Sequence, residues 1–118
     1  MRLLLADDNE MNVEFFSEAL DQFDLTVARD GQSALDAGLS EPFDMILLDI
    51  QMPRLDGNQV CAALRSAGVR VPILALTASA MPDEIIRGRE AGFDDYLTKP
   101  ISPQALRQAI AHHAGRAT

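Results

Sequence analysis

The sequence has one cysteine, few basic residues and no long apolar run. The lone thiol, Cys61, cannot form an internal disulfide, and its amphipathic surroundings predict a buried structural role. No apolar stretch approaches the roughly 20 residues that cross a bilayer, and residues 1–3 lack the apolar stretch of a secretory signal. We therefore expect a cytoplasmic protein without redox or zinc chemistry.

Basic residues are outnumbered by acidic ones, 10 to 18, so that the formal net charge is -8. This charge opposes binding to nucleic acid or to an anionic membrane, and we expect neither as a partner. The 118 residues contain no low-complexity tract and no linker rich in proline, glycine or serine. With 47% apolar residues, the chain can form one core and not two, which predicts one domain over residues 1–118.

Short apolar runs alternate with longer helical patterns. The runs predict strands at residues 3–5, 25–27, 45–48, 73–76 and 96–97. Their apolar residues are mostly consecutive, as in strands that are covered on both faces of a parallel sheet. The predicted helices follow the strands, at residues 10–22, 33–39, 58–66, 83–91 and 103–113. This order predicts an α/β, doubly wound open sheet with its site beyond the carboxyl ends of the strands.

Polar side chains follow four of the predicted strands: Asp7 and Asp8, Asp49, Thr77, and Lys99. Each alone has an ordinary explanation, because carboxylates and hydroxyls cap helices and lysines are common on surfaces. Together they place three carboxylates, an ammonium and a hydroxyl in one crevice, which has a large electrostatic cost. The combination therefore predicts a functional site.

Clustered carboxylates repel one another unless a cation neutralises them, and an all-oxygen site with open positions suits Mg²⁺. A carboxylate beside such a cation can attack the phosphorus of a donor, while Lys99 holds the phosphoryl oxygens. We expect Asp49 to be the acceptor, because its strand lies between the strand that ends in Asp7-Asp8 and the strand that ends in Thr77.

From Arg2 to about Ala114, the chain resembles the receiver domain of two-component response regulators. The matching motifs are Asp7-Asp8, residues 48–53 running on to Asp56-Gly57, residues 76–78, and residues 96–100. The resemblance implies a flavodoxin-like receiver fold, in which five parallel strands in the order 2-1-3-4-5 carry five helices.

The resemblance also implies how the site works. Asp49 takes the phosphoryl group from a phosphohistidine on a histidine kinase or histidine phosphotransfer protein. Mg²⁺ is held by Asp8, Asp49 and the backbone carbonyl of Gln51, with Asp7 contributing through water. Lys99 is the active-site lysine, and its peptide bond to the following proline is usually cis.

The resemblance assigns a switch pair to Thr77 and Tyr96. The Thr77 hydroxyl turns to a phosphoryl oxygen, the Tyr96 ring fills the space, and the surface of helix 4, strand 5 and helix 5 changes for a downstream protein target. Alternatively, Tyr96 is a half-buried aromatic residue whose hydroxyl faces water. Gly88, inside the fourth helix, either eases its rearrangement or marks a close packing contact.

Residues 9–12 resemble the same segment in receivers of hybrid kinases and in single-domain regulators. Met11 and Phe15 lie outside or at the edge of the first helix's apolar stripe, where they either dock a partner helix or are isolated apolar residues on the surface. His112 and His113 are predicted to interact with the C-terminal dipole of the last helix.

The sequence argues against three other functions that a chain of this fold class could have. An aspartate-dependent phosphatase commonly has an acid two residues after its nucleophile, where this chain has Gln51. A flavodoxin-like cofactor binder is disfavoured because Asp7-Asp8-Asn9 would repel a phosphate. A degenerate receiver that acts only as a scaffold would not need the complete set of site residues. We expect a signalling module and not an enzyme, monomeric or weakly dimeric, acting alone or as part of a larger protein.

Overall fold

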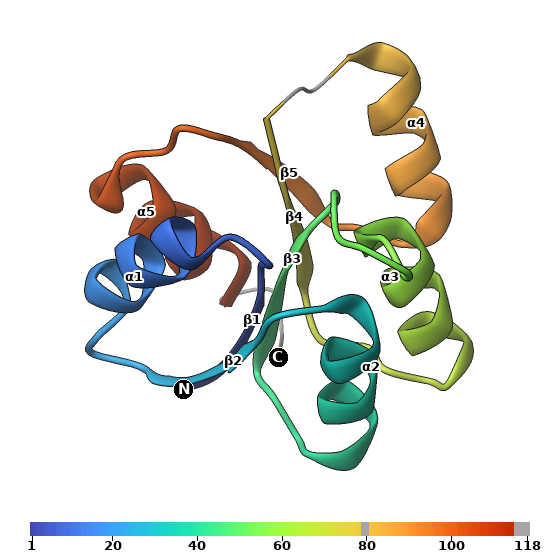
Figure 1. Cartoon of the computed structure of the whole chain (residues 1–118), viewed down its shortest axis with the longest axis horizontal. Helices are drawn as coiled ribbons and strands as arrows, with labels where there is room; N and C mark the ends of the chain where they lie inside the picture. Colours follow the sequence, from blue (N-terminus) through green and yellow to red (C-terminus); the bar gives the residue numbers. More distant parts are fainter. Residues whose placement is uncertain (79–80, 115–118) are drawn as a thin grey trace.

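Within residues 1–78 and 81–114, which the computed structural model describes, five parallel strands form one sheet in the order β2-β1-β3-β4-β5. Helices cover both faces of this sheet (Figure 1). Along the chain, the elements are β1 Arg2–Ala6, α1 Glu10–Ala19, β2 Asp24–Ala28, α2 Gly31–Ser40, β3 Met45–Asp49, α3 Gly57–Ser66, β4 Ile73–Thr77, α4 Pro82–Ala91, β5 Asp95–Thr98 and α5 Pro103–Ala114. The predicted fold class and strand order are confirmed.

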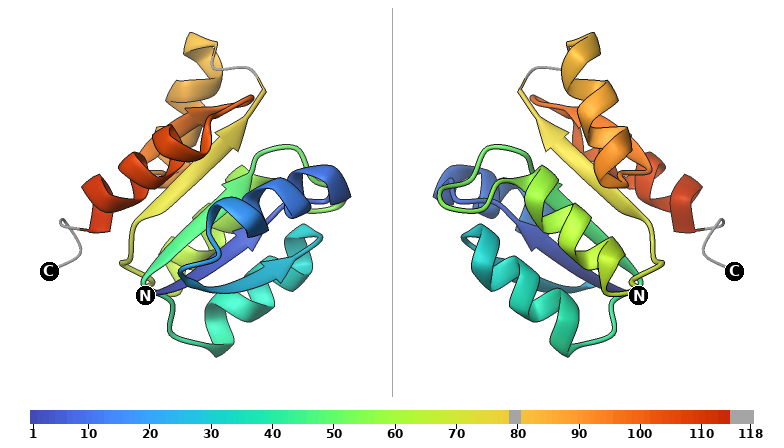
Figure 2. Two further views of the ribbon diagram at one scale, coloured as in Figure 1. Left: turned by 90° about the vertical axis from the view of Figure 1, so that its left-hand side faces the viewer. Right: turned by 90° about the vertical axis from the view of Figure 1, so that its right-hand side faces the viewer.

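The sheet separates two apolar clusters. Leu3 and Leu5 of β1 contribute to the cluster beneath α1 and α5, while Leu4 and Ala6 contribute to the cluster beneath α2 and α3. Figure 2 shows these two helical layers on opposite sides of the sheet. Because both faces are covered, every residue of β3 and β4 is buried, which explains the consecutive apolar runs in the sequence.

Capping residues start three helices soon after the preceding strands end. Asn9 and Asp30 each accept a hydrogen bond from the backbone N–H three residues further on, at the start of α1 and α2. Asp56 and Gln59 form a reciprocal capping box at the start of α3. These short connections keep the side chains at the ends of β1 and β3 at the rim of the sheet.

Two helix boundaries differ from the prediction by two residues or more. α1 ends at Ala19 because the N–H of Leu20 closes the last turn on Phe16, and residues 20–23 then turn into β2. α2 begins two residues earlier than expected, directly after its cap Asp30. Cys61 is buried in α3 and unpaired, as predicted. Among the described residues, no helix has the length and apolarity to span a membrane.

Candidate phosphoacceptor site

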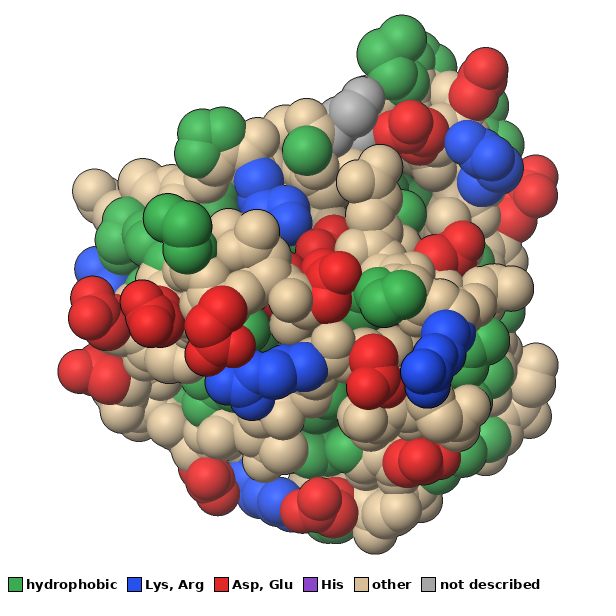
Figure 3. Space-filling model, in the orientation of Figure 1, with side chains coloured by type: hydrophobic (Ala, Val, Ile, Leu, Met, Phe, Trp, Pro, Cys, Tyr) green, Lys and Arg blue, Asp and Glu red, His purple; other side chains and the backbone are tan. Residues whose placement is uncertain are grey.

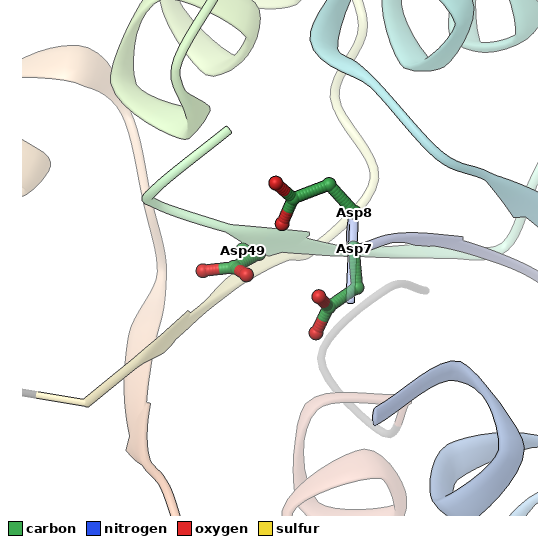
Figure 4. A group of neighbouring side chains, drawn as sticks. All are labelled: Asp7, Asp8 and Asp49. Carbon is green, nitrogen blue, oxygen red and sulfur yellow. The ribbon is translucent and has the colours of Figure 1, made fainter. Parts of the chain in front are cut away.

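The predicted acidic residues meet at the carboxyl ends of β1 and β3. The two strands are neighbours, with Ala6 paired to Leu48, so Asp7 and Asp8 emerge beside Asp49. Each carboxylate offers an oxygen within 4.8 Å of the other two. Figure 4 shows the three side chains gathered around the strand ends.

The site is buried on one side and open on the other. Asp7 is 0% exposed and Asp49 is 5% exposed, whereas Asp8 faces solvent. Burial, followed by repulsion from Asp7, raises the pKa of Asp49 to about 6, although Lys99 and the N–H of Gln51 act in the opposite direction. Asp49 is therefore mostly ionised at neutral pH, at an energetic cost that a nearby cation would reduce.

Lys99 brings its positive charge from β5 to these carboxylates. Its Nζ donates a hydrogen bond of 3.2 Å to Asp49 Oδ2 and lies 3.6 Å from Asp7 Oδ2. The backbone N–H of Lys99 donates to the carbonyl of Thr77, at 2.7 Å, which fixes the chain just beyond β5. The Lys99–Pro100 peptide bond is cis, as the resemblance implied.

The donor atoms fit a divalent cation. Asp7 Oδ1 accepts the N–H of Asn9 at 2.9 Å, and Asp49 Oδ1 accepts the N–H of Gln51 at 3.1 Å. Asp7 Oδ2 is buried and accepts no hydrogen bond from the described residues, so its contact with the Lys99 ammonium is an ion pair at longer range. A buried carboxylate oxygen without a hydrogen bond, among other carboxylates, suits a hard cation with oxygen ligands.

Asp8, Asp49 and Lys99 line a cleft of about 660 Å³, together with Asn12, Gln51 and Met52. Figure 3 shows acidic side chains in the central hollow of this face, with hydrophobic side chains over α1 and α5 beside it. Asn12 of α1 is half-buried and also reaches the cleft. No signal in the sequence distinguished it from an ordinary helix residue.

Gly57 is a second residue whose part in the site the sequence did not explain. Its N–H donates to the carbonyl of Ile50 at 2.8 Å. A Cβ at this position would lie 2.5 Å from the carbonyl oxygen of Asp49. The start of α3 can therefore pack against the end of β3 only because residue 57 is glycine.

Thr77 and Tyr96 line a second cavity of about 190 Å³ between the sheet and α4, which also includes Glu84 and Arg87. Thr77 is buried at the end of β4, and Tyr96 is half-buried on β5. The Tyr96 hydroxyl donates to the carbonyl of Glu84 at 3.2 Å. The structure thus brings the predicted pair to one cavity and gives the Tyr96 hydroxyl a partner in α4.

Met11 and Phe15, for which the sequence left a docking role open, are both exposed on α1. Met11 is 79% exposed and Phe15 is 37% exposed. Phe15, Lys99 and Ile101 line a small pocket of about 160 Å³ between α1 and the segment that links β5 to α5. The apolar surface of α1 is therefore continuous with the rim of the site.

The structure adds a contact that was not predicted for His113. The side chain is 3% exposed, and its Nε2 lies 2.8 Å from Asp95 Oδ2. It joins the end of α5 to β5, in addition to any interaction with the helix dipole. A contact between residues 18 positions apart leaves no local pattern in the sequence.

The family model for the response regulator receiver domain matches residues 3–111. The chain belongs to this family. The sensor histidine kinase GacS of Pseudomonas protegens is 40% identical over 98% of the chain and 13% of its own length. Response regulator MprA of Mycolicibacterium vanbaalenii is 42% identical over 90% of the chain and 47% of its own length. The chain thus spans less than half of these relatives.

Solved receiver domains have the same fold. The receiver domain of the Francisella response regulator 1452 has a TM-score of 0.92 and 33% identity, covering 99% of this chain and 98% of its own. The receiver domain of sensor histidine kinase PA1611 from Pseudomonas aeruginosa has a TM-score of 0.90 and 32% identity, covering 97% of both chains. The PA1611 structure has a magnesium ion coordinated in its active-site cleft.

Proposed function

We propose that this receiver domain accepts a phosphoryl group on Asp49, from a phosphohistidine of a histidine kinase or histidine phosphotransfer protein, with Mg²⁺ as cofactor. One observation carries the proposal: Asp49 is nearly buried between two other carboxylates, with the Lys99 ammonium on its Oδ2, at the floor of an open cleft. This arrangement has little structural purpose and suits phosphoryl transfer.

In the proposed reaction, a carboxylate oxygen of Asp49 forms a bond to phosphorus as the phosphorus–nitrogen bond of the donor breaks. The electron pair of that bond stays on the imidazole nitrogen, and the imidazole leaves neutral when its other nitrogen carries a proton. Because the pKa of Asp49 is about 6, the carboxylate is mostly deprotonated at neutral pH and ready to attack. Lys99 is placed to hold a phosphoryl oxygen in the acyl phosphate.

Asp7, Asp8, Asp49 and the backbone carbonyl of Gln51 would hold the Mg²⁺ ion. When bound, the ion supplies positive charge that offsets both the carboxylates and the phosphoryl oxygens. The chain's own contribution is to bring the carboxylates together and to keep Asp7 and Asp49 away from bulk water. The magnesium ion in the PA1611 receiver domain supports this proposal.

Phosphorylation is proposed to act on the surface formed by α4, β5 and α5. Thr77 and Tyr96 share a cavity that also includes Gln51, two residues beyond the acceptor. A new charge on Asp49 would draw the Thr77 hydroxyl and allow Tyr96 to move, which changes the surface offered to a downstream protein.

The donor protein is proposed to dock on Met11 and Phe15. Both side chains are exposed on α1, and Phe15 borders a pocket that includes Lys99. A helix carrying the phosphohistidine could bury these apolar groups while the imidazole enters the cleft. Met11→Ala with Phe15→Ala should slow transfer from a phosphorylated histidine phosphotransfer domain about tenfold or more, and leave phosphorylation by acetyl phosphate unchanged. An equal loss with both donors would contradict this docking surface.

The competing proposal is a scaffold that never becomes phosphorylated. Mapping the phosphorylated residue separates the two, with phosphoramidate as donor because it has the phosphorus–nitrogen bond of phosphohistidine. Borohydride then reduces an aspartyl phosphate to homoserine, which peptide sequencing detects. We expect homoserine at position 49 only. Homoserine at Asp7 or Asp8, or at no position in a chain shown to bind Mg²⁺, would overturn the assignment.

A further inference from the structure

Gly88 lies on the buried side of α4, directly against Tyr96 of β5. A Cβ at position 88 would overlap the Tyr96 hydroxyl oxygen and the ring carbon that bears it. Glycine weakens a helix interior relative to alanine, so its presence here calls for a compensating contact. The sequence left two explanations open for Gly88, and the structure shows the close contact.

Two contacts hold the Tyr96 phenol against Gly88. Its hydroxyl donates to the carbonyl of Glu84, one helical turn before Gly88, at 3.2 Å. Its ring packs beside Phe93, with the centroids 5.8 Å apart. The hydroxyl therefore occupies a notch in α4 whose walls are backbone, and the hydrogen bond fixes it there.

Open space lies beside Tyr96 in two places. Tyr96 borders the cavity that contains Thr77 and a second cavity, also of about 190 Å³, lined by Ile85, Arg89 and Phe93. Close packing alone does not fix a side chain that borders two cavities. The notch and its hydrogen bond are the features that hold the phenol in place.

Hydrogen bonds also hold the C-terminal end of α4, just beyond the notch. The Arg65 Nε donates to the carbonyl of Gly92 at 3.1 Å, and the N–H of Phe93 closes onto the carbonyl of Gly88 at 3.1 Å. At the other end of the helix, Met81 provides no capping hydrogen bond from its side chain. These bonds hold the C-terminal part of α4 in place. If a side chain at position 88 fills the notch, the Tyr96 phenol therefore moves and the helix does not.

We propose that Gly88 is a positioning residue, whose missing side chain forms the seat of the Tyr96 phenol, so that the size of residue 88 decides where the Tyr96 ring lies. This inference rests on the proposed function in one respect, that Tyr96 belongs to the surface that changes on phosphorylation. The contact between Gly88 and the Tyr96 phenol does not depend on phosphorylation, so it can be tested without a phosphoryl donor.

The chain has a single tyrosine and no tryptophan, so phenol absorbance and the tyrosine ring signals in NMR spectra report on Tyr96 alone. Thermal unfolding of Gly88→Ala, Tyr96→Ala and the double variant forms a double-mutant cycle, with the exposed Glu90→Ala as the control in the same helix. Gly88→Ala should lower the unfolding midpoint of the wild-type chain. It should raise the midpoint in the Tyr96→Ala background, where the notch is empty and alanine favours the helix.

The pKa and the NMR signals of the Tyr96 phenol should show its displacement in Gly88→Ala directly. Burial raises the pKa of Tyr96 in the wild-type chain, and Gly88→Ala should move it back toward the ordinary value and weaken the ring's NMR contacts with α4. Glu90→Ala should change neither. Equal effects of Gly88→Ala with and without Tyr96, or unchanged phenol signals, would overturn the inference. A chain that passes these tests but takes up no phosphoryl group would contradict only the proposed function.

Discussion

The Lys99 ammonium lies 3.2 Å from the Asp49 carboxylate, across the end of the sheet from β5 to β3. This contact spans 50 residues of sequence and passes over the end of β4. It leaves Lys99 beside the proposed acceptor with its charge directed at the oxygens that would carry phosphorus. The roles of these two residues can be separated by experiment.

Replacing Lys99 with alanine should impair chemistry more than metal binding. The three carboxylates remain, without a competing cation, so Mg²⁺ should bind at least as tightly as in the wild-type chain. Loss of the ammonium removes stabilisation of the phosphoryl oxygens and should slow phosphorylation by acetyl phosphate about 100-fold. Calorimetric Mg²⁺ titration and the rate of adduct formation test the two parts. Weaker Mg²⁺ binding with an unchanged rate would contradict this role for Lys99.

Replacing Asp49 with asparagine should stabilise the metal-free fold in a pH-dependent way. The pKa of Asp49 is about 6 when folded and 3.8 ordinarily. The folded chain thus binds this proton more tightly, and the cost of ionising Asp49 is absent below about pH 4, grows as the pH rises, and is fully present above about pH 6. Asp49→Asn should therefore gain roughly 1–3 kcal/mol at neutral pH, and much less at about pH 4.

Urea unfolding in EDTA across this pH range measures the difference. Saturating Mg²⁺ should reduce the advantage of Asp49→Asn, because the ion stabilises the wild-type carboxylate. A gain that is the same at acid and neutral pH would show that the ionisation of Asp49 is not its cause.

The meeting of the site residues could be predicted because it follows from topology. Residues at the carboxyl ends of parallel strands meet at one edge, so Asp8, Asp49 and Lys99 could be brought together without coordinates. The apolar runs identified the strands because β3 and β4 are fully buried. These strands could be predicted because burial on both faces requires apolar residues along the whole strand.

Contacts between single side chains could not be predicted in this way. The seat of Tyr96 on Gly88 depends on the distance between β5 and α4, which no periodic pattern encodes. The burial of His113 against Asp95 likewise depends on how α5 crosses the sheet. Helix ends were misplaced by two or three residues because hydrogen bonds of the caps, and not hydrophobicity, decide them.

Arg65 should stabilise the end of the sheet opposite the site, where β4 and β5 begin. Its guanidinium donates to the carbonyls of Val69, Val71 and Gly92 and to the Asp94 carboxylate. A lysine cannot reproduce this fork, so Arg65→Lys should cost about 2 kcal/mol in the free energy of unfolding. Arg29→Lys, at an exposed pair with Glu10, should change stability little. Equal losses in urea unfolding would contradict this special role.

Arg54 should be a site where glycine stabilises the fold. Its φ of 71° lies in the left-handed region, which strains a residue with a Cβ. Arg54→Gly should therefore raise the free energy of unfolding by about 0.5–1 kcal/mol. Arg70 is a matched control, because it is an exposed loop arginine without a positive φ. Arg70→Gly should give no gain in the same urea unfolding assay, and a similar gain at both positions would exclude backbone strain as the reason.

The most direct measurement is the intact mass of the chain after incubation with acetyl phosphate, with and without Mg²⁺, beside Asp49→Asn. The wild-type chain should gain the mass of one phosphoryl group only when Mg²⁺ is present, and Asp49→Asn should gain none. An equal adduct on Asp49→Asn, or no adduct on a wild-type chain with Mg²⁺ demonstrably bound, would contradict the central claim that Asp49 is the phosphoacceptor.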